Sequence, residues 1–414
     1  MSKERIISLD VLRGITILMM VLVNNPGSWE NIFAPLEHSE WHGCTPTDLV
    51  FPFFIFILGA AIPLAMITKV LNQQTFLKIL TRSLRIISLG LFLGFYEKIE
   101  IFELEGYPLL ISKLIITGVV AYILLGNFEQ KIKFYSVLIL FTLLIFLAFS
   151  GFETYGDVRI PGVLQRIGIV YFFASLVYLK TGIKGQIITV AVLLLGYWAV
   201  ITLIPIPGFG PANLDKGTNL AGWIDNLLLK NHLWSHSKTW DPEGVLSTLP
   251  ALGTGLLGML VGHMLWTGGA KELKKVAYLG AIFLFLAWAW NSVFPINKSL
   301  WTGSYVLLSG GFARLLLAGF YYLIEVKGVR KGIQVFQLFG ANPMLVFFFS
   351  GIIPRAFNMI KIDEKGLISW LNTHAIQVFF TDPYRASLAG AFVYLIIWGI
   401  LLVLFDRKKL IFKV

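Results

Sequence analysis

Residues 48–67 read Asp-Leu-Val-Phe-Pro-Phe-Phe-Ile-Phe-Ile-Leu-Gly-Ala-Ala-Ile-Pro-Leu-Ala-Met-Ile, with the only charge at the first position. About 20 apolar residues suffice for an α-helix to cross the hydrocarbon core of a bilayer. Twelve such stretches occur along the chain, at 7–25, 48–67, 78–96, 109–126, 132–150, 160–180, 185–204, 245–266, 274–292, 301–324, 335–351 and 387–405. The sequence therefore predicts an all-α, polytopic membrane helix bundle of about 12 (10–12) transmembrane helices.

The composition of the whole chain leads to the same class. Its 414 residues are 57% hydrophobic and 14% charged, with a mean hydropathy of +0.76. Soluble domains hold about 45–50% apolar and about 25% charged residues, so a soluble, disordered or nucleic-acid-binding protein is excluded. The single cysteine, Cys44, excludes an internal disulfide framework and a cysteine-rich metal site. No repeat or linker divides the chain, which predicts one membrane domain over residues 1–414.

The net charge of +11 is interpreted as a topology signal. If the N-terminus is inside, 20 of the 34 Lys and Arg residues fall in inside segments and 10 in outside segments. An excess of basic residues marks the cytoplasmic side of a membrane protein. We therefore expect both termini to be cytoplasmic.

Polar residues near the helix ends form two sets. Ionisable groups at membrane depth are costly, so each is first treated as a functional candidate. One set lies at the predicted outer face: Asn24, His38, Asp48, Arg159, Gln165, Arg166, Asp241, Glu243 and Lys298. The other belongs to the cytoplasmic half, Asp10, Arg13, Arg82 and Arg85, with Arg314 near the middle of its span. The pattern suggests a site at the outer face with a basic lining that runs toward the cytoplasm.

His38 and Asp48 are the leading catalytic candidates. A loop histidine is usually only solvated, and an aspartate at the start of a span is favoured by capping and the helix dipole. Asp48 could also bond the imidazole of His38, fix its tautomer and make it a general base. Both interpretations stay open at this level.

The remaining polar residues also have structural explanations. Arg159 and Arg166 could be interfacial arginines that reach toward water, and Asp241 and Glu243 could cap a helix. Arg13 could pair with Asp10 one turn earlier, or meet a phosphate. Four glycines between Gly253 and Gly262 favour close helix packing over a functional role.

The chain contains none of the common nucleotide or metal motifs. We find no phosphate-binding loop, no dinucleotide fingerprint and no nucleophile elbow. His42, His232, His236, His263 and His374 lack metal-ligand spacing, so no metal is predicted.

Several motifs occur in a family order. They are Ser8-Leu-Asp-Val-Leu-Arg-Gly14, Val23-Asn24, His38-Ser-Glu-Trp-His-Gly-Cys-Thr45 leading into Asp48–Gly59, Arg159-Ile-Pro-Gly-Val-Leu-Gln-Arg166, Asp241–Pro250, Asn297–Thr302 and Gly340-Ala-Asn-Pro343. Each is weak by itself. As an ordered set, they resemble the heparan-α-glucosaminide N-acetyltransferase family, and the size suggests a bacterial member. Residues 97–157 and a slightly longer loop between Asn24 and His38 depart from the human-type enzyme.

The resemblance implies an activity and site residues. Enzymes of this family move an acetyl group from cytoplasmic acetyl-CoA to the amine of a terminal glucosamine across the membrane. By position, His38 resembles the catalytic histidine, Asp48 the nearby acid and Asn24 the asparagine that faces the thioester. The CoA phosphates would be bound by Arg13, Arg82, Arg85 and Arg314. The sugar would be bound by Arg159, Gln165, Arg166, Asp241, Glu243 and Lys298.

The expected protein is thus an acetyl-CoA-dependent N-acetyltransferase, multi-pass in a bacterial inner membrane. Its partners would be acetyl-CoA, an amino sugar or glycan and the lipid bilayer, with no nucleic acid, and a homodimer is considered. Transfer could be direct or pass through acetyl-His38. The alternatives are an amino-sugar transporter, against which no paired discontinuous helices are found, and an O-acetyltransferase of an envelope glycan.

Overall fold

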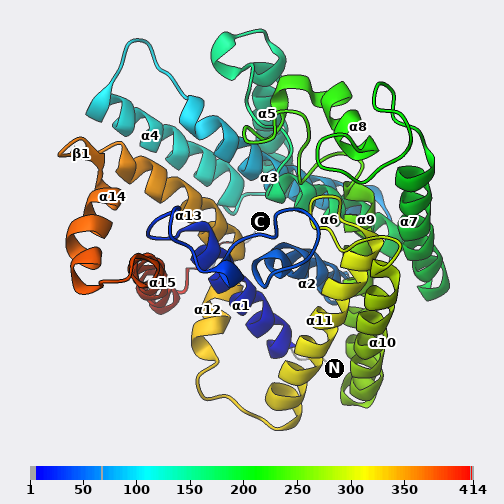
Figure 1. Ribbon diagram of the computed structural model, residues 1–414. Helices are drawn as coiled ribbons and strands as arrows, with labels where there is room; N and C mark the ends of the chain where they lie inside the picture. Colours follow the sequence, from blue (N-terminus) through cyan, green and yellow to red (C-terminus); the bar gives the residue numbers. More distant parts are fainter. Residues whose placement is uncertain (1–5, 67–68, 411, 413–414) are drawn as a thin grey trace.

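The computed structural model describes residues 6–66, 69–410 and 412 and is helical throughout most of its length (Figure 1). Ile67, the last residue of the stretch at 48–67, lies outside the described residues. The helices and strands are α1 (Ile7–Asn24), α2 (Val50–Ala65), α3 (Gln73–Phe95), α4 (Gly106–Leu125), α5 (Gln130–Phe149), α6 (Val163–Lys180), α7 (Ile183–Leu203), α8 (Leu220–Leu229), α9 (Thr248–Gly268), α10 (Leu273–Asn291), α11 (Gly303–Tyr321), α12 (Gln334–Ala341), α13 (Pro343–Asn358), β1 (Lys361–Ile362), β2 (Lys365–Gly366), α14 (Leu367–Leu371) and α15 (Pro383–Arg407).

Short helical segments connect several of these elements. They are η1 (Ala34–Leu36), η2 (Thr47–Leu49), η3 (Tyr96–Lys98), η4 (Glu153–Tyr155), η5 (Lys230–His232), η6 (Gly269–Glu272), the π-helical η7 (Tyr322–Val326) and η8 (Asn372–Ile376), and η9 (Gln377–Phe379). The strands β1 and β2 form one small antiparallel hairpin in which Ile362 pairs with Lys365. Helices therefore account for nearly all regular structure among the described residues.

The chain is a multi-pass membrane protein, but the expected count of twelve spans is not confirmed. By length and composition, the described residues contain nine candidate spans, or ten if the bent pair α12 and α13 is one span. The basic helix α3 is not among the nine, and residues Thr248–Asn291, which comprise α9 and α10, count once as a stretch of 44 residues. Each of the twelve expected stretches nevertheless overlaps a helix.

The stretch expected at 335–351 is not one straight helix. It is divided between α12 and α13, whose axes differ by 79°. The break falls at Asn342, whose φ of −122° and ψ of 47° are not helical. Proline at position 343 explains this break, because its ring disfavours the helical conformation of the residue before it and it has no N–H to donate.

The connecting loops gather at two ends of the bundle. The loops of the His38 end comprise residues 25–49, 96–105, 150–162, 204–247, 292–302 and 359–382. Those of the Arg82 end, named after a residue in the N-terminal half of α3, comprise 69–72, 126–129, 181–182, 269–272 and 322–333. Contacts between the loops define the two groups. At the His38 end, Ile160 N donates to His232 O over 3.0 Å. At the Arg82 end, Lys69 Nζ donates to Thr181 O over 3.1 Å.

The described residues nearest the two termini lie at the same end of the bundle. Arg13 Nη1 donates to Gly340 O over 3.2 Å, and Phe412 N donates to the side chain of Asn342 over 2.8 Å. Both contacts are made to the junction of α12 and α13. Segments near the two ends of the described chain therefore both contact this junction.

The glycines of α9 bring this helix against α2, as the sequence predicted. A methyl group on Gly258 would lie 1.9 Å from the carbonyl oxygen of Phe56, and one on Gly262 would lie 2.1 Å from that of Ala60. These distances leave no room for a side chain, because the obstacle is backbone. The helix pair is the rigid base on which the loop between α1 and α2 is mounted.

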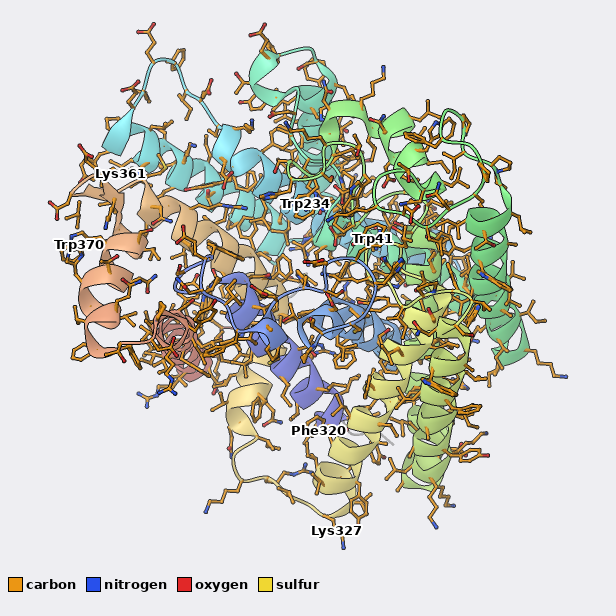
Figure 2. All side chains as sticks on the ribbon, viewed as in Figure 1. Trp41, Trp234, Phe320, Lys327, Lys361 and Trp370 are labelled. Atoms are coloured by element: carbon orange, nitrogen blue, oxygen red, sulfur yellow. The ribbon has the colours of Figure 1, made fainter. Side chains whose placement is uncertain are left out.

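A separate apolar cluster caps the His38 end beside this pair. It includes Tyr197 and Ile201 of α7 and Phe294 and Leu300 of the loop between α10 and α11. The hydroxyl of Tyr197 also donates to Leu300 O over 2.6 Å. Figure 2 shows Trp41 and Trp234 among the loops of this end, whereas Lys327 lies at the opposite edge of the view. The cap thus fixes a loop that contributes to the site described next.

Candidate active site

His38 and Asp48 meet, as the sequence suggested. Asp48 lies in η2, directly before α2, and its side chain is fully buried, whereas the side chain of His38 is 53% exposed. Asp48 Oδ1 is 2.7 Å from His38 Nδ1. An ionised carboxylate only accepts hydrogen bonds, so Nδ1 carries the proton and Nε2 keeps its lone pair. A half-exposed imidazole in this tautomer can accept a proton from a ligand.

Asp48 is held by more than the imidazole. Its Oδ2 accepts hydrogen bonds from Ser39 N at 3.1 Å, Thr45 N at 3.0 Å and Thr45 Oγ1 at 3.2 Å. Its backbone oxygen accepts one from the hydroxyl of Tyr305 at 2.5 Å. These contacts anchor the loop 38–45 to α2 and α11. The orientation of His38 is therefore set by a carboxylate that cannot move freely.

Lys298 is the second charged group beside His38. Its Nζ lies 3.1 Å from His38 Nδ1, 3.2 Å from His38 Nε2 and 3.7 Å from Asp48 Oδ1. The side chain is only 16% exposed. Burial lowers the pKa of Lys298, and the negative charges of Glu243 and Asp48 counteract this effect. The sequence placed Lys298 among the sugar ligands, but its nearest partners are the catalytic candidates themselves.

Arg159 binds both carboxylates of the Asp241-Pro-Glu motif. Its Nε is 2.8 Å from Asp241 Oδ2 and its Nη2 is 2.5 Å from Asp241 Oδ1, in the two-pronged geometry that suits guanidinium and carboxylate. Nη2 also contacts Glu243 Oε2. Burial alone would lower the pKa of Arg159, but Glu243 and Asp241 raise it above its usual value. These two acidic residues are therefore ion-pair partners, which capping alone did not require.

Arg166 and Asp225 hold the loop 241–247 from opposite sides. Arg166 is buried in α6, and its Nη2 donates to Gly244 O at 3.0 Å and Ser247 Oγ at 2.5 Å. Asp225 of α8 accepts hydrogen bonds from Asp241 N at 3.2 Å and Val245 N at 2.8 Å. This clamp fixes the carboxylates that Arg159 binds. Burial raises the pKa of Asp225 to about 7.

Asp225 and Tyr305 are site residues that the sequence did not reveal. Asp225 lies in Gly222-Trp-Ile-Asp-Asn226, where a single acid on a short helix is typical of a solvated face. Tyr305 lies within an apolar stretch, where a tyrosine is usually a core residue. Tyr305 is 257 positions from its partner Asp48. Asp225 is 16 positions from Asp241, but the path of the loop between them could not be predicted.

Asn24 and Gln165 are not joined to this cluster. Asn24 is the last residue of α1 and lies at the His38 end, but among the described hydrogen bonds none links it to His38 or Asp48. The side chain of Gln165 is buried between α3 and α6, where its Oε1 would lie 2.2 Å from a methyl group on Gly90. Gln165 thus fills a helix interface.

The four arginines expected to bind CoA phosphates lie in different places. Arg82 and Arg85 lie on α3, where Arg82 stands over the ring of Tyr171 and Arg85 Nη2 donates to Gly126 O over 3.0 Å. Arg13 lies on α1, and its Nη1 contacts Asp10 at 2.9 Å.

Arg314 lies elsewhere, 4.0 Å from the ring centre of Phe283 on α10. The buried Nε atoms of Arg82, Arg85 and Arg314 have no hydrogen-bond partner among the described residues. Only Arg82 and Arg85 therefore form a basic pair.

The cluster at the His38 end can support proton transfer next to fixed charges. It offers one imidazole with an available nitrogen, one buried ammonium and three carboxylates that already have cationic partners. Among the described residues, no group of three or more His, Cys, Asp or Glu side chains is arranged to hold a metal ion. The chemistry best matched to this arrangement is general-base catalysis on a bound nucleophile.

Known proteins resemble this chain over most of its length. The family described as "Domain of unknown function (DUF5009)" matches residues 5–203. Human heparan-alpha-glucosaminide N-acetyltransferase is 28% identical over 400 residues, which cover 83% of this chain and 52% of the human protein. The mouse enzyme is 28% identical over 403 residues, which cover 84% of this chain and 53% of the mouse protein. The chain spans about half the length of these curated relatives. This similarity is consistent with a distant relationship to heparan-alpha-glucosaminide N-acetyltransferases.

Proposed function

We propose that this chain is a membrane acetyltransferase that transfers the acetyl group of cytoplasmic acetyl-CoA to the amine of glucosamine or of a glucosamine-terminated glycan on the extracytoplasmic side. The observation that carries the proposal is the contact of 2.7 Å between His38 Nδ1 and the buried Asp48. It leaves His38 Nε2 as a base on a half-exposed ring. The names of the curated relatives support the acetyl group and the glucosamine acceptor.

The reaction requires a base because a protonated amine cannot attack a thioester. His38 Nε2 would accept the proton of the amine, and Asp48 would stabilise the imidazolium that forms. Asn24 would polarise the acetyl carbonyl, since an oxyanion develops there. Direct transfer and an acetyl-His38 intermediate are both compatible with this geometry.

The acceptor sugar would bind beside His38 against Arg159, Arg166, Asp241, Glu243 and Lys298. Arg159 and Arg166 are the better hydroxyl ligands, because their remaining N–H groups can donate to sugar oxygens. Gln165 would contribute only if its side chain left the interface with α3. An acceptor at this place lies within reach of His38, since Lys298 contacts both His38 and Asp48.

The donor would enter from the Arg82 end. Arg82 and Arg85 carry buried Nε atoms that no described residue binds. Guanidinium groups match the geometry of phosphate oxygens. Arg13 and Arg314 are proposed as further contacts along the path. In this arrangement the protein is one transmembrane acyltransferase domain over 1–414, with the Arg82 end on the cytoplasmic face of a bacterial inner membrane.

Purified full-length protein in lipid nanodiscs provides the test. We expect release of free CoA from acetyl-CoA that depends on glucosamine and is lost in His38→Ala. Release of CoA over many turnovers without glucosamine, or a wild-type rate in His38→Ala, would overturn the proposal. Treatment of the product with neutral hydroxylamine separates an N-acetyl product, which is stable, from an O-acetyl product, which is cleaved. Uptake of labelled N-acetylglucosamine by proteoliposomes without acetyl-CoA would instead indicate the transporter.

A further inference from the structure

Lys298 places a primary amine of the protein beside its own base. The Nζ atom lies 3.1 Å and 3.2 Å from the two ring nitrogens of His38. An atom in the ring plane at nearly equal distances from both nitrogens would overlap the carbon between them. Nζ therefore lies over a face of the imidazole. The in-plane lone pair of Nε2 stays open for a ligand, and the amine lies against the ring at 3.2 Å from Nε2.

The backbone around Lys298 keeps this amine in place. Trp301 N donates to Lys298 O over 3.0 Å, and the side chain of Asn297 accepts from Leu300 N over 2.8 Å. The carbonyl of Leu300 is in turn bound by the hydroxyl of Tyr197. With the backbone fixed and the side chain largely buried, the Nζ atom has little freedom to leave.

The chemistry at Nζ is that of the acceptor in the proposed function. Both are primary amines that must lose a proton to attack an acetyl thioester. Burial favours the uncharged form of the amine at Lys298, which is the nucleophilic one. A bound acetyl donor without an acceptor would thus face the amine of Lys298.

We propose that Lys298 is a site of self-acetylation, modified by a bound acetyl thioester when no acceptor amine occupies the site. The inference rests on the proposed function. In the reaction, a bond forms between Nζ and the acetyl carbonyl carbon, and the carbon–sulfur bond breaks. Of the two protons that the ammonium gives up, one passes to solvent before the attack and the other protonates the leaving thiolate. The products are Nζ-acetyl-Lys298 and free CoA.

The modification would inactivate the chain that carries it. Acetylation removes the positive charge that faces Asp48 and Glu243, and leaves these buried carboxylates with fewer partners. An amide is stable to water, so the loss would accumulate. An acceptor sugar would protect Lys298 by consuming the acetyl group first. Acetylated Lys298 would thus identify the protein molecules that had bound the acetyl donor in the absence of an acceptor.

Peptide mass spectrometry of the full-length protein in nanodiscs tests the proposal. The protein is incubated with acetyl-CoA, with or without glucosamine, and the acetylated fraction is measured at Lys298 and at the exposed Lys216 and Lys238 of the same end. Because proximity raises the effective concentration of an amine, we expect a fraction at Lys298 about tenfold or more above the two exposed lysines. Glucosamine should suppress it, and neutral hydroxylamine should leave it intact.

The variant Lys298→Arg is the matched control, since it keeps a cation there but offers no acetylatable amine. Its residual activity should no longer decline during preincubation with acetyl-CoA. If glucosamine-dependent CoA release occurs while Lys298 is acetylated no more than the exposed lysines, the inference is wrong and the proposed function stands. If neither occurs, the proposed function itself fails.

Discussion

The charged side chains of interest at the two ends of the bundle differ in whether they have partners of opposite charge. At the His38 end, Arg159 faces two carboxylates and Lys298 faces Asp48. At the Arg82 end, Arg82 and Arg85 lie close enough to repel each other, and both carry a buried Nε without a partner. Arg159 and Lys298 thus have acidic partners without a ligand. Among the described ion pairs none includes Arg82 or Arg85, although other cations of their end are paired.

This difference separates two tasks. Fixed charge pairs preorganise a reaction centre, because the groups need not reorient when charge develops. An uncompensated basic pair is costly in the free protein and gains most when an anion binds. The His38 end is therefore suited to catalysis and the Arg82 end to the phosphates of a donor. The following predictions test this division.

The largest effect is expected from the base. His38→Ala should lower glucosamine-dependent CoA release about a hundredfold or more, because a positioned general base contributes about 10²–10⁴ to the rate. His42→Ala changes a neighbouring histidine of the same loop and serves as the matched control for loss of fold. A similar rate loss in both variants would point to a disturbed loop and not to a missing base.

The next effect concerns stability at the His38 end. Arg159→Met should lower the free energy of unfolding by about 3 kcal/mol, since Asp241 and Glu243 would stay buried without their cation. Thermal denaturation in detergent measures the change. Arg159→Lys should lose less, because it restores the charge but not the two-pronged contact. An unchanged melting temperature in Arg159→Met would mean that this end does not depend on its ion pairs.

The opposite behaviour is expected at the Arg82 end. Arg82→Met should raise the KM for acetyl-CoA about tenfold, since one charge-assisted hydrogen bond is worth about 1.5–3 kcal/mol. Its melting temperature should stay the same or rise, because the variant removes repulsion from Arg85. The control Lys78→Met changes an exposed cation one turn earlier on α3. Equal effects of the two substitutions on KM would contradict a specific phosphate site.

The smallest effect is a pH dependence of stability that arises from Asp225. Its pKa is about 7 in the folded protein and 3.8 in the reference state, so the folded protein holds this proton more tightly. The stabilisation is complete below pH 3.8 and is lost as the pH rises toward 7. Asp225→Asn should remove this component from a series of melting temperatures between pH 4 and 8. A decline that persists unchanged in the variant would assign it to another group.

The sequence predicted the helical elements well and the site in part. Apolar stretches identified the helices because hydropathy is a local property. The contact between His38 and Asp48 could be suggested from the sequence because the residues are only ten positions apart. The bend at Asn342 was missed because the stretch 335–351 was interpreted by hydropathy, although Pro343 was visible.

Contacts between distant positions could not be read from the chain. Arg159 and Asp241 are 82 positions apart, and Lys298 is 260 positions from His38. Nothing in their local sequences distinguishes an ion pair from a solvated or capping residue. Gln165 shows the converse, since its local sequence did not indicate that its side chain packs against Gly90 of α3.

Hydropathy along the chain is enough to identify a helical membrane protein, and the order of its motifs is enough to show a resemblance to one family. The reason is that the hydropathy of a span and the spacing within a motif depend only on residues that are close together in the sequence. The position of Lys298 over His38 is seen only in the folded protein. The same holds for the hydrogen bonds by which Asp225 holds the loop of Asp241. Those positions follow from the packing of α2 on α9 and of the loop cap on α7, and such packing depends on many residues at once.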